Sequence, residues 1–489
     1  MEARVGAADV VRNMGSVVPP PRRIGRPTML AYGFGAVAYG VKDASFGTFV
    51  MMFYNQVIGL PAQAVGLVVM LALVLDALID PAIGFFSDRT QSRWGRRHPW
   101  MYASALPIAV GWLFLWNPPG LSEGWTLAWL FVTAVIVRSA VSCYEVPSVA
   151  LTPELTVDYD ERTRIMAYRY VFGWAGGLLM LLAAYGIFLT PAPGQESGLL
   201  NRGGYVGFAI AGAIAMVVAI LVSALGTHHE IKNLPRPKTE RTSLRRGFRE
   251  LLETANNKAF VILMLAGLCL YTNQGMGYSI SNYLYSYVWR FSPASLVALS
   301  GVLFVGVLIA FFAAPRLAKR FGKKQTAAGA ITIGALMMAS PYVLRLAGLF
   351  PAPDSPIMPW PLFAIYVCTT ACNVSAAMIG ASMMADVVEH SEVKTGRRSE
   401  GVFFAGAFFI QKCTSGVGLA VTGTIISLAG MSAKLAPGQV PEASLDRLTI
   451  LFAGTYVALG LAGAALFLCF PFGREEHEAR VAALGGRAD

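Results

Sequence analysis

Long apolar stretches separated by short polar loops run along almost the whole chain. Each stretch has about 20 residues or more, which is enough to cross the hydrocarbon core of a bilayer as a helix. The pattern predicts an all-α membrane protein with twelve spans in two sets of six, at 29–57, 62–88, 100–117, 123–153, 166–190, 204–226, 259–288, 295–315, 326–348, 358–388, 401–430 and 449–471.

The polar segments between these spans divide the chain into parts. We expect two six-helix bundles, at 29–226 and 258–472, joined by a linker at 227–257 that carries one short amphipathic helix, with tails at 1–28 and 473–489. The first tail lacks an apolar segment ahead of a small-residue cleavage site, so it is predicted to be a cytoplasmic tail and not a signal peptide. Two similar helical sets around a long linker are typical of a duplicated transporter repeat.

The composition agrees with a membrane protein and excludes other classes. Hydrophobic residues make up 55% of the chain, charged residues only 14%, and the mean hydropathy is +0.55. The net charge of +11 does not indicate a nucleic-acid partner, because the basic residues lie between apolar spans. The six cysteines lie within apolar spans without C-x-x-C spacing, so we expect core packing and no cofactor.

Basic residues gather in the loops after the second, fourth, eighth and tenth spans. The loops on the opposite side carry only scattered basic residues. By the positive-inside rule, both termini and the linker are expected on the cytoplasmic side of a plasma membrane, here a bacterial inner membrane. The residues behind this orientation are Arg89, Arg93, Arg96, Arg97, Arg162, Arg164, Arg316, Lys319, Arg320, Lys323, Lys324, Lys394, Arg397 and Arg398.

Two aspartates interrupt the second span. Asp76 and Asp80 are four residues apart, so they lie on one helix face about one turn apart. A carboxylate at bilayer depth costs on the order of 3 kcal/mol or more, so such residues face the bundle interior, water or a cation. Two carboxylates this close cannot both stay ionised in a low dielectric unless a cation compensates them. The pair predicts a cation site, with a purely structural pair as the alternative.

Several long motifs resemble those of a known transporter family. The stretch D-x-x-x-D-P-x-x-G-x-x-x-D-R-T-x-S-R-W-G-R-R-H-P starts at Asp76, A-D-V-V-E occupies 385–389, and K-T-G-R-R-S-E-G occupies 394–401. Together they resemble the melibiose-permease-like glycoside–pentoside–hexuronide:cation symporters of the major facilitator superfamily. The resemblance extends from Lys42 to Lys412. It implies a cation-coupled importer of a sugar, glycoside or uronide that alternates access between its halves, and we expect it to act as a monomer in the lipid bilayer.

The resemblance also implies a cation site. Asp76 and Asp80 match the family's paired carboxylates for the coupling cation. Ser142 matches a hydroxyl of that site, and Lys412 matches a lysine near it that couples the halves. Ile79 stands where the family has an asparagine, which removes one oxygen ligand for a hard ion. Na⁺ at Asp76 and Asp80 stays possible, and we expect H⁺ to be the coupling ion.

Substrate residues follow from the resemblance and from polar groups within spans. Lys42, Asp43, Glu145 and Arg169 fall where the family binds sugar hydroxyls, and charged groups suit vicinal diols. The family's stacking aromatics correspond to Val149 and Ala377, so that role is either moved to another aromatic or lost. Candidates for stacking are Tyr144, Trp174, Tyr271 and Tyr278; Arg138, Asn273, Gln274 and Asn282 either line the cavity or bond neighbouring helices. Tyr283, Tyr285 and Tyr287 are expected in an interfacial belt.

The loop after the second span predicts a cytoplasmic gate. Carboxylates and guanidiniums near helix ends form ion pairs that close the inner mouth, in addition to the topological role of the arginines. The predicted gate comprises Asp88, Arg89, Arg93, Arg96 and Arg97, with Glu161, Arg162 and Glu389 as partners.

Two other functions stay open at this point. A symporter of an amphiphile such as a lysophospholipid is possible, because the vertebrate lysophosphatidylcholine transporter resembles this family too and Phe403, Phe404, Phe408 and Phe409 enrich one span. A membrane enzyme or sensor has little support, since the sequence shows no nucleophile elbow, phosphate-binding loop or metal cluster. We therefore expect a transporter and not an enzyme.

Overall fold

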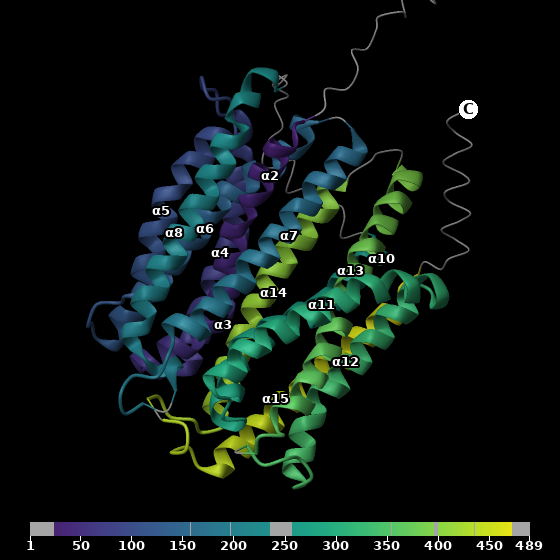
Figure 1. Ribbon diagram of the computed structural model, residues 1–489. Helices are drawn as coiled ribbons and strands as arrows, with labels where there is room; N and C mark the ends of the chain where they lie inside the picture. Colours follow the sequence, from purple (N-terminus) through teal and green to yellow (C-terminus); the bar gives the residue numbers. More distant parts are fainter. Residues whose placement is uncertain are drawn as a thin grey trace, which may run out of the picture.

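The computed structural model describes residues 24–156, 158–195, 197–234, 257–353, 355–395, 400–434 and 436–471. The predicted amphipathic helix of the linker and most of both tails lie outside these ranges. Within them the chain forms twelve helical stretches that coincide with the twelve predicted spans (Figure 1). Ten of the described helices are long and apolar enough to cross a membrane.

The first half of the chain forms six of these stretches. The first span is divided at Gly35, and two spans end in a turn of π-helix. The elements are α2 (Arg26–Phe34), α3 (Ala36–Met52) and η1 (Phe53–Ile58); α4 (Ala62–Arg89); α5 (His98–Trp116); α6 (Glu123–Leu155); α7 (Tyr159–Ala183) and η2 (Ala184–Phe188); and α8 (Arg202–His228), with short turns η3 (Gly198–Leu200) and η4 (His229–Asn233).

The second half repeats the arrangement. Its elements are α10 (Lys258–Tyr283) with η5 (Leu284–Val288), α11 (Pro293–Phe321), α12 (Lys323–Leu346), α13 (Pro359–Thr395), α14 (Glu400–Leu428) and α15 (Glu442–Leu468). In Figure 1 the first half and the second half form two neighbouring bundles, in purple to teal and in teal-green to yellow. The last span starts at Glu442, seven residues before the predicted 449, because the helix continues into polar residues outside the apolar stretch.

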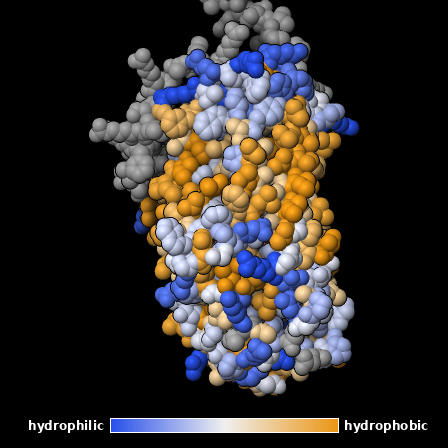
Figure 2. Space-filling model, turned by 90° about the vertical axis from the view of Figure 1, so that its left-hand side faces the viewer, coloured by the Kyte–Doolittle hydropathy of each residue, from blue (hydrophilic) through white to orange (hydrophobic). Residues whose placement is uncertain are grey.

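The molecule has two polar ends. The basic-loop end carries the loop between α4 and α5, with the arginines from Arg89 to Arg97, and the far end carries the loop between η1 and α4. Between the ends, large apolar side chains face outward, including Leu106 at 72% exposure, Trp125 at 71% and Phe312 at 65%. Apolar residues cover much of the face in Figure 2 and polar residues gather toward its ends, as a lipid-facing surface requires.

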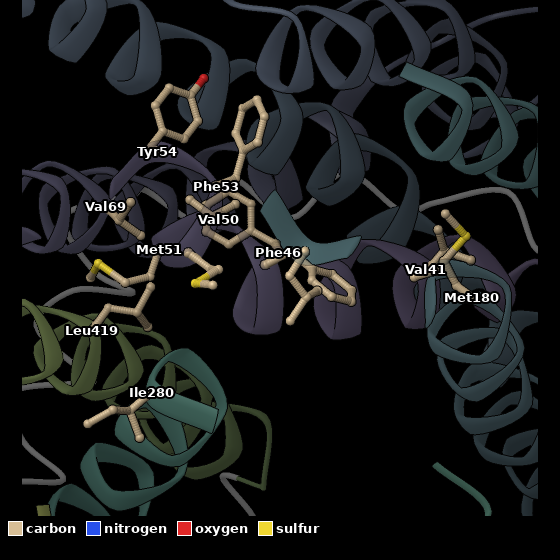
Figure 3. Close-up of a cluster of buried hydrophobic side chains, with 14 of the residues drawn as sticks. Val41, Phe46, Val50, Met51, Phe53, Tyr54, Val69, Met180, Ile280 and Leu419 are labelled. Atoms are coloured by element: carbon tan, nitrogen blue, oxygen red, sulfur yellow. The ribbon is translucent and has the colours of Figure 1, made fainter. Parts of the chain in front are cut away.

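The two halves pack tightly against each other along α4 and α14. A Cβ atom at Gly66 would lie 2.7 Å from the carbonyl oxygen of Leu419, and one at Gly423 would lie 2.3 Å from that of Ala62. Small residues allow helix backbones in a membrane to approach this closely. Figure 3 shows Met51, Val69, Ile280 and Leu419 gathered at this junction, from α3, α4, α10 and α14.

Hydrogen bonds join the halves at the far end. The Tyr185 hydroxyl donates to Asn282 Oδ1 at 2.8 Å, and Asn282 Nδ2 donates to the Thr48 carbonyl oxygen at 2.9 Å. The Tyr283 hydroxyl donates to Asn55 Oδ1 at 2.8 Å. Asn282 therefore bonds neighbouring helices. The interfacial-belt prediction was wrong for Tyr283, Tyr285 and Tyr287, which are 0%, 8% and 1% exposed, because all three belong to the buried core.

Candidate functional site

The α4 carboxylates face the interior of the molecule. The Asp76 side chain is 1% exposed and the Asp80 side chain is 24% exposed. Pro81 follows Asp80 inside the helix, where it lacks the N–H that would bond the Ala77 carbonyl. The two predicted carboxylates thus lie on one face of α4 that points into the molecule, Asp76 fully buried and Asp80 partly buried.

Asp76 is held by α6. Arg138 Nε donates to Asp76 Oδ2 at 2.9 Å, and the Ser142 hydroxyl donates to Asp76 Oδ1 at 3.2 Å. Arg138 and Ser142 are four residues apart, so one face of α6 supplies both donors. Arg138 is 5% exposed and makes a buried ion pair with Asp76. Of the two roles that the sequence left open for Arg138, it therefore bonds a neighbouring helix.

Lys412 connects the two halves at the same place. Its ammonium comes from α14 and lies 3.0 Å from Asp76 Oδ2. It also pairs with Asp80 Oδ2 and lies 3.4 Å from the Ser142 hydroxyl. Asp80 Oδ1 is buried without a hydrogen-bond partner among the described residues. The four residues predicted for the cation site thus lie in contact, with Arg138 added to them.

A second group of charges lies beside this cluster on α3 and α6. Lys42 Nζ is 3.2 Å from Asp43 Oδ1 and 4.8 Å from the centre of the Tyr39 ring. The Lys42 side chain is 4% exposed, whereas that of Asp43 is 47% exposed although it lies in the middle of α3. Glu145 is half-buried, within electrostatic range of Lys42 and Arg169. An exposed carboxylate at membrane depth faces water and not lipid.

The second half contributes Tyr278 to the same region. Its ring lies against Gly47 of α3, where a built Cβ would be 3.6 Å away, and it is within electrostatic range of Asp43. Tyr278 is 42% exposed. Of the aromatics considered as replacements for the family's stacking residues, Tyr278 is therefore placed beside the predicted substrate residues.

Other predicted substrate residues lie one layer deeper. Arg169 is 6% exposed, donates to the Ser148 hydroxyl at 2.7 Å and lies over the Tyr32 ring at 5.3 Å. Tyr144 is fully buried against Gly35. Asn273 is 6% exposed and donates to the Tyr456 carbonyl oxygen of α15 at 3.0 Å.

Each of these three side chains packs within its own bundle: Arg169 and Asn273 through hydrogen bonds, and Tyr144 against Gly35. The expectation that they reach the substrate directly is corrected for Tyr144 and Asn273. Tyr271 is half-buried and Gln274 is exposed on α10.

The basic loop forms ion pairs with one carboxylate that the sequence analysis did not single out. Arg96 lies 2.8 Å and Arg97 3.1 Å from Glu154 Oε1 at the end of α6. Arg97 also pairs with Asp88, and it donates to the Ser87 hydroxyl at 3.0 Å. Asp88 therefore pairs with one of the predicted arginines and Glu154 is a further partner, and all of these residues belong to the first half.

The other predicted gate residues make different contacts. Arg89 lies over the Phe85 ring at 3.5 Å, and Arg93 lies over the Trp94 ring at 5.4 Å. Glu161 accepts from the Ile24 backbone N–H and the Thr156 hydroxyl. It therefore binds the segment just before α2 and does not take the partner role that Glu154 has.

Two predicted partners of the basic loop remain. Arg162 donates to the backbone carbonyls of Thr156 at 2.8 Å and Pro153 at 3.3 Å. Glu389 is half-buried on α13.

Residues 31–474 match the model of the family described as MFS/sugar transport protein. The chain belongs to this family. The match covers both bundles, which confirms the predicted major facilitator fold, the resemblance to glycoside–pentoside–hexuronide:cation symporters and the assignment as a multi-pass membrane transporter.

Similar proteins agree with this membership. The transporter is 27% identical to the isoprimeverose transporter of Lactiplantibacillus pentosus, over 82% of this chain and 80% of that protein. It is 24% identical to the sodium-dependent lysophosphatidylcholine symporter 1 of Gallus gallus, over 98% and 94% of the two chains. The inward-open structure of the E. coli xylose transporter has a TM-score of 0.62 at 13% identity, over 92% of this chain and 98% of that one, and shows the same fold.

Three residues near the site were not assigned to it from the sequence, and for one of them, Arg138, helix periodicity would have indicated its place. Arg138 lies mid-span, four residues before Ser142, so a search for residues on the Ser142 face would have found it. Glu154 is an acid at the very end of a span, close to the basic loop only in three dimensions. Tyr39 carried no signal beyond its position one turn before Asp43.

Proposed function

We propose that this transporter is a cation-coupled symporter of a sugar, glycoside or uronide that works by alternating access. The observation that carries the proposal is the contact of Lys412, on the second half, with Asp76 and Asp80 on the first half. A change in the occupancy of the carboxylates changes an ion pair between the halves. Ion binding is therefore coupled to the relative position of the halves.

The substrate binds beside this cluster. Asp43 and Glu145 supply carboxylates that accept hydrogen bonds from vicinal hydroxyls, and Tyr278 supplies a ring face from the other half. The site therefore has contributions from both bundles, as alternating access requires of a midplane site. Arg169 lies one layer deeper, where it donates to the Ser148 hydroxyl, and its charge is within electrostatic range of Glu145.

The orientation follows from the basic residues. With the basic-loop end in the cytoplasm, as the positive-inside rule directs, the far end faces the outside of the cell. The α4 and α14 contact and the Asn282 network then close the outer side. The ion pairs of Arg96 and Arg97 with Glu154 stabilise the cytoplasmic side of the first half.

The coupling ion is H⁺. Asp80 Oδ1 is buried without a hydrogen-bond partner among the described residues, so this oxygen is free to accept a proton. Ile79 offers no oxygen to a metal ion next to it. Protonation of Asp80 removes one of the two charges that hold Lys412, which weakens the link between the halves.

A second candidate substrate is an amphiphile. Phe408 is four residues before Lys412, so it lies on the same face of α14, one turn nearer the basic-loop end, and it is 59% exposed. An exposed apolar ring on an inward face suits an alkyl tail. The similarity to a lysophosphatidylcholine symporter supports the same possibility.

Calorimetry with the purified transporter distinguishes the two substrates. A panel of glycosides, uronides and lysophospholipids is titrated into the wild type, Glu145→Gln, Phe408→Ala and the control Glu123→Gln, an exposed acid on the same helix. A lost charged hydrogen bond costs about 1.5–3 kcal/mol, so Glu145→Gln should weaken sugar binding at least tenfold. Lysophospholipid binding that is weakened by Phe408→Ala and not by Glu145→Gln would contradict the sugar proposal.

A further inference from the structure

We propose that Arg138 is a built-in counter-cation that takes the place of an alkali ion at Asp76 and makes the site unable to bind Na⁺. The inference rests on the proposed cation-coupled function and names the residue that sets its ion selectivity. Ile79 removes one ligand from such a site, but Arg138 supplies a positive charge where the ion would be.

Both carboxylate oxygens of Asp76 already have partners. Its Oδ2 atom accepts a hydrogen bond from Arg138 Nε at 2.9 Å and lies 3.0 Å from Lys412 Nζ. Its Oδ1 atom accepts a hydrogen bond from the Ser142 hydroxyl at 3.2 Å. The side chain is 1% exposed. A Na⁺ ion would have to displace a buried guanidinium from its partner, which leaves a buried charge uncompensated and is strongly unfavourable.

The charges of the cluster are already balanced. Asp76 and Asp80 carry two negative charges, and Arg138 and Lys412 carry two positive charges within direct contact of them. A buried site with no net charge has little electrostatic attraction for an alkali ion, whereas a proton forms a covalent bond with a carboxylate oxygen. Replacing Arg138 by a neutral residue would leave one excess negative charge, which is the condition that attracts a monovalent cation.

Arg138 is fixed in this position and keeps its charge. It is 5% exposed and its guanidinium lies 5.5 Å from the centre of the Phe46 ring on α3. The guanidinium does not lose its proton in proteins, so the positive charge at Asp76 is permanent. Asp43 and Asp80 are also within its electrostatic range. The counter-charge is thus part of the fold and is not exchanged with solution ions.

Two explanations for Na⁺ exclusion make opposite predictions. If the missing oxygen at Ile79 is decisive, Ile79→Asn should create Na⁺ binding with Arg138 in place. If the charge of Arg138 is decisive, Ile79→Asn should remain without Na⁺ binding, and Arg138→Gln should gain it. Arg138→Lys keeps the charge and should behave as the wild type.

The experiment measures Na⁺ binding without a substrate. The thermal unfolding of purified full-length wild type, Ile79→Asn, Arg138→Gln, Arg138→Lys and the control Arg345→Gln is followed during titration with NaCl against choline chloride. Arg345 pairs with Asp446 and Glu442, away from the site. We expect Na⁺ stabilisation only in Arg138→Gln, with a dissociation constant at least tenfold below that of the wild type.

Several results would overturn the inference. Na⁺ stabilisation of the wild type that Asp76→Asn removes would show that Arg138 leaves the site open. A gain of Na⁺ binding in Ile79→Asn alone would assign selectivity to position 79, and this variant decides the matter even if Arg138→Gln does not fold. A folded Arg138→Gln variant whose thermal unfolding does not change with Na⁺ would also refute the inference. None of these readings depends on transport, so a failure here is distinct from a failure of the symport proposal.

Discussion

Asn282→Ala should loosen the closed far end of the transporter by a predictable amount. The change removes two hydrogen bonds between the halves, one with the Tyr185 hydroxyl at 2.8 Å and one with the Thr48 carbonyl at 2.9 Å. A net hydrogen bond contributes about 0.5–1.5 kcal/mol, so the closed arrangement should lose about 1–3 kcal/mol. That corresponds to a shift of about 5- to 150-fold in the equilibrium between closed and open arrangements.

Hydrogen exchange measured by mass spectrometry reports this shift. Peptides that cover η1 and η5 should lose protection by the same factor, because exchange there follows the opening equilibrium. Ser281→Ala is the matched control, since its hydroxyl donates to the Tyr278 carbonyl within its own helix and not across the halves. If the protection of these peptides changes no more in Asn282→Ala than in Ser281→Ala, the network does not hold the far end closed.

Two further predictions concern the ends of the bundle. Glu154→Gln leaves the buried Arg97 with less compensation, and because breaking a buried pair costs about 3–5 kcal/mol the thermal unfolding temperature should fall clearly. Glu442→Gln at the exposed Arg345 pair should change it little, and equal effects would contradict the reasoning. Gly66→Val should prevent close contact of α4 with α14, so α14 peptides should exchange faster; unchanged exchange would show that the contact tolerates a side chain.

Much of the fold was predictable because its determinants are local. An apolar stretch of membrane length is visible in the sequence, and the twelve spans match the helices closely. The break at Gly35 and the π-helical turns were not predicted, since both depend on contacts made after the helices assemble. The closing of the far end by Asn282 also required the three-dimensional arrangement, as Thr48 is 234 residues away.

The site was predictable where helix periodicity or family resemblance placed residues together. Asp76 with Asp80 follows from their spacing, and Ser142 with Lys412 follows from the resemblance. The partner of Arg138 could not be predicted, because the sequence gives the face of α6 but not the helix that packs on it. For the same reason Glu154 was missed, and Tyr144 and Asn273 were expected at the substrate when their partners lie within their own bundles.

Accumulation of substrate in proteoliposomes tests the central claim most directly. Vesicles with the wild type, Asp76→Asn or Asp80→Asn receive a labelled glycoside or uronide that binds in calorimetry, under an imposed proton gradient, an imposed Na⁺ gradient or neither. The account predicts that the wild type concentrates the substrate above its external level with the proton gradient alone, and that neither variant does. Accumulation by both variants equal to that of the wild type, or by the wild type with the Na⁺ gradient alone, would contradict it.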